Sequence, residues 1–357
     1  MEPATLLTDL PTDVVEHIVV RLTLAHHIAR IAPTSRVISV AVRNAIMVRG
    51  FSCEVLTLAG HTNWVQSVAA APDGRIVTGS HDRTIKVWRD GACECTIQAH
   101  TEQVMAVAVL PGGARFVSGS SDRTAKLWTL DGALERTFEM GTSAHCVAAL
   151  PDGVHFVVGL AGGPGEVRLY HVDGTLVHTF KGHTDSFVSA VAVTPDGQHI
   201  ISGSWDKLVK VWSVASKSLV STCEGHADMV LAVAAMPDGQ RFLSGGNDYT
   251  VRVWLLDGTL KNTFQLHTDA VLALVALPDN QHALSGSTDK TVKLFNVNDG
   301  AVLRTFKHHL NYVFSLALLP DGLRFVSGSG DRTARIAYHG LSLIHISEPT
   351  RQEAISY

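Results

Sequence analysis

Short apolar runs recur along most of the chain and are separated by turns rich in glycine, proline and aspartate. In one unit the apolar run Val230–Met236 leads to the tripeptide "PDG", then to a β-rich run that ends in a turn at Asp248, and then to a third run that ends at Trp254. Short runs of this kind, with turn residues between them, predict an antiparallel meander of short strands. The almost continuously apolar first run is typical of a strand buried on both faces.

This unit repeats with a period of about 41 residues. The stretch "SGSSDRTAKLW" (Ser118–Trp128) has counterparts in five other units, and a histidine opens each of these six. A proline marks the "PDG"-type turn in all seven units: Pro72, Pro111, Pro151, Pro195, Pro237, Pro278 and Pro320. Because two antiparallel strands return the chain to its starting edge, the opening histidine and the turn aspartate are expected at the same end of each sheet.

The repeated "GH", "PDG", "SGSxD" and "VKVW" elements resemble those of the WD-repeat family, in which a repeat of this length is one four-stranded blade of a β-propeller. The resemblance implies an all-β fold, a seven-bladed propeller of four-stranded antiparallel blades over residues 51–340. Each repeat begins between the outer strand of one blade and the inner strand of the next. The leftover segment Cys53–Gly60 is therefore expected to complete the last blade and close the ring.

The resemblance also implies a buried relay of hydrogen bonds through histidine, aspartate, serine or threonine, and tryptophan in each regular blade. The expected members are His61, Thr78, Asp82, Trp88, His100, Ser118, Asp122, Trp128, His183, Ser202, Asp206, Trp212, His226, Ser244, Asp248, Trp254, His267, Ser285, Asp289, His309, Ser327 and Asp331. The same residue types form hydrolytic triads, but a nucleophile site occurs once per protein and a scaffold bond once per structural unit. Six copies favour the structural interpretation, and we predict a protein that is not an enzyme.

Units three and seven depart from the pattern. Unit three has Met140 in place of the histidine, Val158 in place of the serine, no turn aspartate and a glycine-rich insertion, so we expect a blade held by packing through Tyr170 with a longer, looser turn. Unit seven ends in Ala337 where a tryptophan is expected.

Residues 9–50 change to a helical period and predict three short helices. They are too few for a large core of their own and need a partner surface. The segment resembles an F-box, the module that docks a substrate receptor onto a Skp-like linker of a cullin ubiquitin ligase, although no tryptophan follows the "TSR" at Thr34–Arg36. The expected ligase-docking residues are Leu10, Pro11, Val14, Val15, Ile18 and Leu22. The alternative is a helical cap over one face of the propeller.

In WD-repeat proteins ligands usually lie on the rim of the central channel, on loops that enter the inner strands and on the residue before each turn aspartate. The residues at those positions that we expect to bind a protein or peptide are Trp64, Gln66, His81, Gln103, Met105, Phe187, Trp205, Met229, Asn247, Tyr312 and Phe314. The set is rich in aromatic residues and methionine, as protein interfaces are, and contains no arginine or lysine. Because Arg83, Arg123 and Arg332 are interpreted as turn residues, a phosphopeptide reader is not predicted.

Composition narrows the function classes further. A net charge of -4 and a pI near 6.5, without a basic run, argue against nucleic acid and anionic membranes as partners. No apolar run approaches the roughly 18 residues of a membrane span, and the acidic N-terminus does not resemble a secretory signal. The five cysteines lack zinc-type spacing and are interpreted as reduced structural thiols, so we expect a soluble cytoplasmic or nuclear protein without cofactor or metal.

Residues 341–357 carry no repeat signal and resemble the translation of a sequencing-library adapter, so we exclude them from the fold.

Two functions stay open: a substrate-recognition subunit of a Skp-cullin-F-box ubiquitin ligase, and a general scaffold of the G-protein β-subunit kind with the N-terminal helices as a cap.

Overall fold

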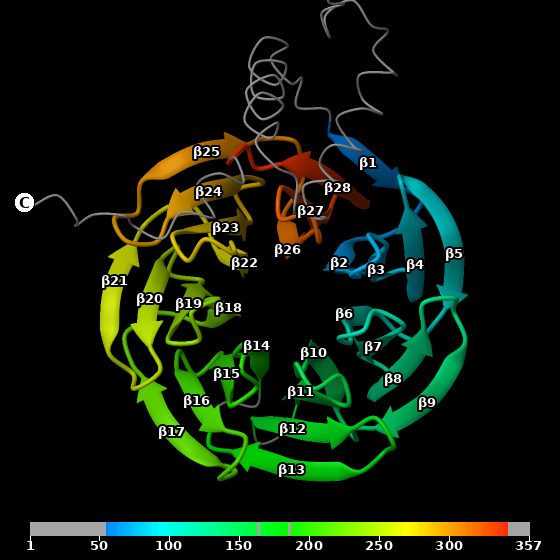
Figure 1. Cartoon of the computed structure of the whole chain (residues 1–357), viewed down its shortest axis with the longest axis horizontal. Coiled ribbons are helices and arrows are strands. Elements are labelled where there is room, and N and C mark those ends of the chain that lie inside the picture. Colours follow the sequence, from blue (N-terminus) through cyan, green and yellow to red (C-terminus); the bar gives the residue numbers. More distant parts are fainter. Residues whose placement is uncertain (1–54, 163–164, 185–186, 342–357) are drawn as a thin grey trace, which may run out of the picture. The chain divides into compact units, whose positions relative to one another are not determined.

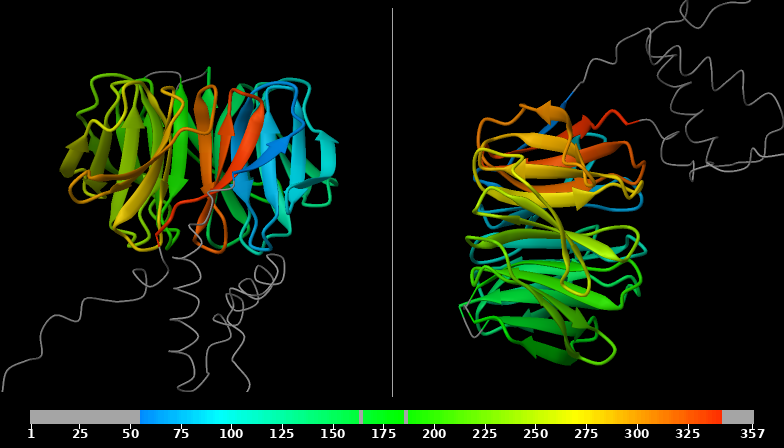
Figure 2. Two further views of the ribbon diagram at one scale, coloured as in Figure 1. Left: turned by 90° about the horizontal axis from the view of Figure 1, so that it is seen from above. Right: turned by 90° about the vertical axis from the view of Figure 1, so that its left-hand side faces the viewer.

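The computed structural model describes residues 55–162, 165–184 and 187–341, and there the chain forms seven four-stranded antiparallel sheets. Figure 1 shows these sheets as blades arranged around a central opening, with β2, β6, β10, β14, β18, β22 and β26 innermost. In Figure 2 the strands of each blade run between the two faces of the ring. The seven-bladed propeller predicted from the repeat is confirmed.

The first four blades follow one another along the chain. Blade 1 is β2 (Val65–Ala70), β3 (Ile76–Ser80), β4 (Thr84–Arg89) and β5 (Ala92–Gln98), and blade 2 is β6 (Val104–Val109), β7 (Arg115–Ser120), β8 (Thr124–Thr129) and β9 (Leu134–Glu139). Blade 3 is β10 (Ser143–Ala149), β11 (His155–Ala161), β12 (Glu166–His171) and β13 (Leu176–Lys181), and blade 4 is β14 (Val188–Val193), β15 (His199–Ser204), β16 (Val209–Ser213) and β17 (Ser218–Cys223).

The last three blades bring the chain back to its first strand. Blade 5 is β18 (Val230–Ala235), β19 (Arg241–Gly246), β20 (Val251–Leu255) and β21 (Leu260–Phe264), and blade 6 is β22 (Val271–Ala276), β23 (His282–Ser287), β24 (Val292–Asn296) and β25 (Val302–Phe306). Blade 7 is β26 (Val313–Leu318), β27 (Arg324–Ser329), β28 (Thr333–Tyr338) and, as its outer strand, β1 (Leu56–Ala59). The predicted ring closure is therefore confirmed.

The closing strand is held by both pairing and burial. In register, Leu56 pairs with Ile336 and Ala59 with Thr333, and the Leu58 side chain between them is 0% exposed. Joining the first strand to the last blade pairs the outer edge of β28 and so links the two ends of the ring.

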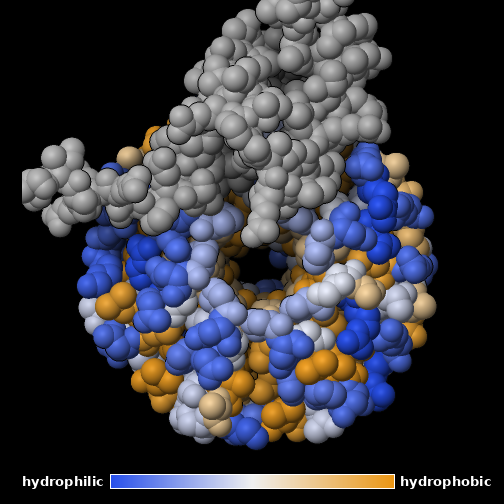
Figure 3. Space-filling model, viewed as in Figure 1, coloured by the Kyte–Doolittle hydropathy of each residue, from blue (hydrophilic) through white to orange (hydrophobic). Residues whose placement is uncertain are grey.

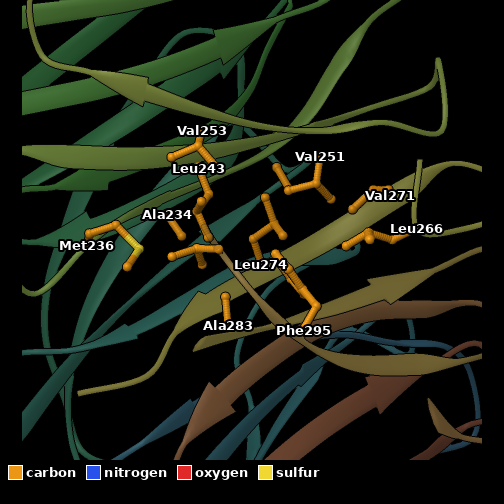
Figure 4. Close-up of a cluster of buried hydrophobic side chains, with 12 residues drawn as sticks. Ala234, Met236, Leu243, Val251, Val253, Leu266, Val271, Leu274, Ala283 and Phe295 are labelled. Atoms are coloured by element: carbon orange, nitrogen blue, oxygen red, sulfur yellow. The ribbon is translucent and has the colours of Figure 1, made fainter. Parts of the chain in front are cut away.

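The core lies between the blades. One apolar layer joins Leu243, Val251 and Val253 of blade 5 to Val271 and Phe295 of blade 6 (Figure 4). The glycine that follows the relay serine allows this close approach, because a Cβ on Gly245 would lie 2.6 Å from Val271 Cγ1 of the next blade. The "SG" of the repeat is thus a packing requirement at the blade interface.

Blade 3 has all four strands although its unit lacks the polar markers. Met140, Val158 and Leu160 are buried together there with Tyr170, whose ring stacks 5.7 Å from Phe156. Met140 and Val158 stand at the two positions of the missing histidine–serine bond, so neither partner of that bond is left unsatisfied, and such an exchange costs little. The packing role predicted for Tyr170 is observed, and residues 163–164 of the insertion lie outside the described residues.

Other expectations fall on residues that the structure does not describe. These are the helices and ligase-docking residues predicted within 9–50, Cys53, and the tail at 342–357. Of the four described cysteines none is in a disulfide; Cys146 and Cys223 are buried, whereas Cys93 is exposed and has no structural role in the core.

Candidate functional site

The relay of blade 1 shows how each regular blade is fixed. The Trp88 indole N–H donates to Thr78 Oγ1 (2.9 Å), which lies 2.7 Å from His61 Nε2, and His61 Nδ1 lies 2.8 Å from Asp82 Oδ2. A neutral histidine satisfies this chain: the hydroxyl donates to Nε2, and Nδ1–H donates to the carboxylate. The same carboxylate oxygen accepts the Thr62 amide at 2.9 Å and so anchors the loop that enters the inner strand.

Five further blades repeat the histidine, hydroxyl and aspartate part of this arrangement, and three of them also have the tryptophan donor. The distance from the histidine Nδ1 to the aspartate is 2.7–2.9 Å in each, and that from Nε2 to the serine Oγ is 2.7 or 2.8 Å. Burial by itself raises the pKa of the Asp82 carboxyl, but hydrogen bonds from His61, Thr84 and the Thr62 amide outweigh it and hold the pKa well below its usual value. The aspartates are therefore ionised acceptors at neutral pH.

These distances match those of a hydrolytic triad, but the hydroxyl groups are not accessible to a substrate. The side chains of Thr78, Ser118, Ser202, Ser244, Ser285 and Ser327 are all 0% exposed. Four of these hydroxyls also accept an indole N–H. None of the six can reach a substrate, so the relay fixes loops and does not provide a nucleophile.

Blade 7 lacks the indole donor and has a substitute that the sequence analysis missed. His308 Nε2 lies 3.2 Å from Ser327 Oγ, beside the relay histidine His309. Burial, followed by the charges of His309 and Arg335, lowers the pKa of His308 to about 4, so its neutral ring can donate one N–H to the serine. No motif in the sequence marks His308 for this role.

The inner strands share a second feature, which lines the channel. A β-bulge interrupts the pairing of the first two strands near the start of the inner strand in all seven blades. A bulge re-aims the extra side chain, and these half-buried residues form one layer of the channel wall at the rim: Gln66, Met105, His145, Ser189, Leu231, Leu272 and Phe314. Figure 3 shows one face of the ring, with the opening at its centre.

His145 is a rim residue that the sequence prediction left out. It lies six residues before Pro151, as each of the other six layer residues lies six residues before the proline of its unit, but unit three lacks the histidine and aspartate markers. Its ring lies 4.4 Å from that of Phe187, and burial, with a smaller effect of His81, lowers its pKa to about 4. The layer therefore carries no charge at neutral pH.

The predicted rim residues gather into two aromatic groups on the face that carries the relay aspartates. In blade 4 the rings of Phe187 and Trp205 stack with centroids 4.0 Å apart. Across blades 7 and 1, Phe314 stacks on Trp64 at 5.4 Å and contacts Tyr312. Trp64, Trp205 and Tyr312 are nevertheless 37–40% exposed, so packing under neighbouring loops does not conceal them.

The remaining predicted rim residues surround these groups. Gln103 is exposed. The half-buried ones are Gln66, His81, Met105, Met229 and Asn247, and Asn247 donates to Asp228 Oδ2 at 2.6 Å.

Among the described residues no cluster of histidine, cysteine and carboxylate side chains could hold a metal ion. The described part of the chain contains no helix that is both long and apolar enough to cross a membrane.

Comparison with known proteins agrees with this architecture. Six segments match the family described as "WD domain, G-beta repeat": residues 52–89, 91–129, 174–213, 217–254, 258–296 and 300–336, together more than half of the chain. None of them includes residues 130–173, which hold most of blade 3.

The names of similar proteins refer to different processes. The chain is 29% identical over 179 residues to nuclear distribution protein PAC1 of Coccidioides posadasii, which is 48% of this chain and 33% of that protein. It is 25% identical over 154 residues to the ribosome biogenesis protein WDR12 homolog of Nematostella vectensis, or 43% of this chain and 28% of the relative. A 55-residue match, 46% identical, covers 15% of this chain and 7% of the phospholipase A-2-activating protein of Xenopus laevis. The chain spans a third or less of the length of each of these relatives.

Proposed function

The chain belongs to the WD40-repeat family, and we propose that it is a protein-binding scaffold that holds its cargo on the rim of the ring that carries the relay aspartates. The observation that carries this proposal is the division of roles in each blade. The polar relay is buried and fixes the loops, while the aromatic residues Trp64, Trp205 and Tyr312 on those loops stay exposed. Rigid loops that present aromatic anchors are the usual construction of a protein interface.

We further propose that this scaffold is the substrate-recognition subunit of a Skp-cullin-F-box ubiquitin ligase. The support is the F-box-like pattern of Leu10, Pro11, Val14, Val15, Ile18 and Leu22, which lie outside the described residues. The path of the chain is compatible with it. Leu56 pairs with Ile336, and Tyr338 with Arg324, so the chain enters and leaves the ring beside the "PDG" turn of blade 7, on the face opposite the relay aspartates.

The alternative is a general WD-repeat scaffold in which the first fifty residues cap the propeller. The names of the similar proteins span nuclear distribution, ribosome biogenesis and phospholipase activation, and what they share with this chain is the repeat. Either function places the protein in the cytoplasm or nucleus, where such complexes form.

Affinity capture separates the two. The full chain, a chain without residues 1–50, and Leu10→Asp would be expressed in the same cells, and bound proteins quantified by mass spectrometry. The ligase proposal requires a Skp-like linker on the full chain only, with the cargo retained by all three. If the full chain captures no linker, the scaffold remains and the ligase role is wrong.

A further inference from the structure

One sector of the rim is both more apolar and more positively charged than the loops that enter blades 5 and 6. It lies where the ring closes, on the loops of blades 7 and 1. Leu310 is 78% exposed, and next to it Tyr312, Phe314, Trp64 and His81 form a continuous row of rings with centroids 5.3–6.1 Å apart. We refer to these five residues as the closure patch.

The backbone of the closure patch is fixed although its side chains are exposed. The Leu310 amide donates to the relay carboxylate of Asp331 at 3.1 Å, and the Gly330 amide donates to the Tyr312 carbonyl at 3.0 Å. In blade 1 the His81 amide donates to the Trp64 carbonyl, also at 3.0 Å. A surface that is already ordered loses little conformational entropy when it binds.

Basic side chains flank the patch. Arg83 and Arg332 follow the relay aspartates of the two blades, in left-handed turn positions with φ of 73° and 70°, and both are exposed. Lys307, three residues before Leu310, is exposed as well. Among the described residues none of these three forms an ion pair.

Accessible carboxylates are missing from the same loops. The acidic residues that the structure describes on this face of blades 7 and 1 are Asp82 and Asp331, whose side chains are only 7% and 8% exposed and are bound to their histidines. The loops that enter blades 5 and 6 differ, because they carry Asp228 and Asp269.

A comparison of equivalent positions shows that this charge difference is not required by the fold. Asp228 and Asp269 each accept the amide of the following residue at 2.8 Å. Asn63 and Asn311 make the same bond at the same length in blades 1 and 7. Asparagine therefore accepts the turn hydrogen bond at the same distance as aspartate does. At the closure patch the acceptor is a neutral asparagine side chain, whereas in blades 5 and 6 it is a carboxylate.

From these observations we propose that the closure patch binds a protein segment in which an apolar side chain is flanked by carboxylates. The apolar residue would pack on Leu310 and the Trp64 ring, and the carboxylates would face Arg83, Arg332 and Lys307. This inference rests on the proposed scaffold function and names the chemistry of its partner. It makes the exposed arginines after the turn aspartates part of the binding surface as well as of the turns.

The test uses the full chain and synthetic labelled peptides in fluorescence polarisation. Each peptide has a central leucine or phenylalanine with two flanking residues on either side, which are glutamate, glutamine, lysine or phosphoserine. We expect glutamate-flanked peptides to bind about tenfold more tightly than glutamine-flanked ones, and the difference to shrink as salt is added. Equal binding of glutamate and lysine peptides, or binding of phosphoserine peptides without any binding of glutamate peptides, would overturn the proposal.

Matched variants locate the effect. Asn63→Asp with Asn311→Asp keeps both turn bonds, loses only the 3.3 Å bond from Asn311 Nδ2 to the Gly330 carbonyl, and adds two carboxylates. It should weaken glutamate-peptide binding about tenfold, and Asn63→Asp alone, which loses no hydrogen bond among the described residues, should weaken it in the same direction. Asp228→Asn with Asp269→Asn makes the reverse exchange on the other side of the rim and should leave it unchanged. Equal effects of the two pairs would contradict a site at the closure patch. If cargo captured from cells depends on Trp64 but no peptide set binds, the scaffold stands and the partner chemistry is wrong.

Discussion

Asp206→Asn perturbs the relay of blade 4 with the smallest change of shape. The Asp206 carboxylate is 3% exposed and accepts from His183 Nδ1 at 2.8 Å, the Thr184 amide at 2.9 Å and the Leu208 amide at 3.0 Å. Asparagine has one oxygen and one NH2 group in place of two oxygens. Whichever way the amide turns, at least one of the three donors faces another donor.

The magnitude follows from that count. A buried donor that loses its acceptor costs about 1–3 kcal/mol, and the remaining bonds weaken because the acceptor is no longer charged. We therefore expect the free energy of unfolding to fall by about 1–3 kcal/mol. For a domain of this size the melting temperature should fall by roughly 2–5 °C.

Thermal unfolding followed by calorimetry or circular dichroism measures this shift. Asp257→Asn is the matched control, because Asp257 is an exposed turn aspartate that accepts the Thr259 amide at 2.8 Å. The control should have the same melting temperature as the unmodified protein. If Asp206→Asn also has the melting temperature of the unmodified protein, the relay does not contribute to stability, and the interpretation of the relay as a structural element is wrong.

Three further predictions concern the ring. Gly203→Ala places a Cβ 2.6 Å from Val230 Cγ1 and should cost about 1–3 kcal/mol in urea unfolding; an unchanged midpoint would show that the blade interface can yield. Leu58→Ala empties a 0% exposed site in the closing strand and should cost about 2–5 kcal/mol by the same assay, whereas a neutral result would deny that strand a stabilising role. The lowered pKa of the relay aspartates gives stability that is complete above the ordinary carboxyl pKa of 3.8 and is lost as the pH falls through the folded value, because the unfolded chain binds protons first. Urea midpoints should therefore drop mainly below about pH 4, and Asp206→Asn should reduce that drop.

The fold could be predicted because its determinants recur locally. Each proline, histidine and aspartate marks one end of a strand, and six copies at a constant spacing leave little choice of register. Ring closure could be predicted because each repeat begins between the outer strand of one blade and the inner strand of the next. The pairing of Leu56 with Ile336 confirms this prediction.

The parts of the site that the sequence did not reveal depend on contacts between distant residues. Trp64 and Phe314 belong to the first and the last repeat, and only the closed ring brings their rings within 5.4 Å. His308 matches no motif because it substitutes for a missing tryptophan across the blade. His145 is marked in the sequence by Pro151 alone, because the bulged residue lies six positions before the proline in every unit.

We propose that the buried relay holds the ring and that the exposed rim binds the cargo. Quantitative capture of cargo by Trp64→Ala with Trp205→Ala, at a melting temperature measured for the same sample, tests this division most directly. We predict that cargo falls several-fold while the melting temperature stays within a few degrees of the unmodified protein, since both indoles are 37–39% exposed. Full retention of every captured protein by this folded variant would contradict the claim.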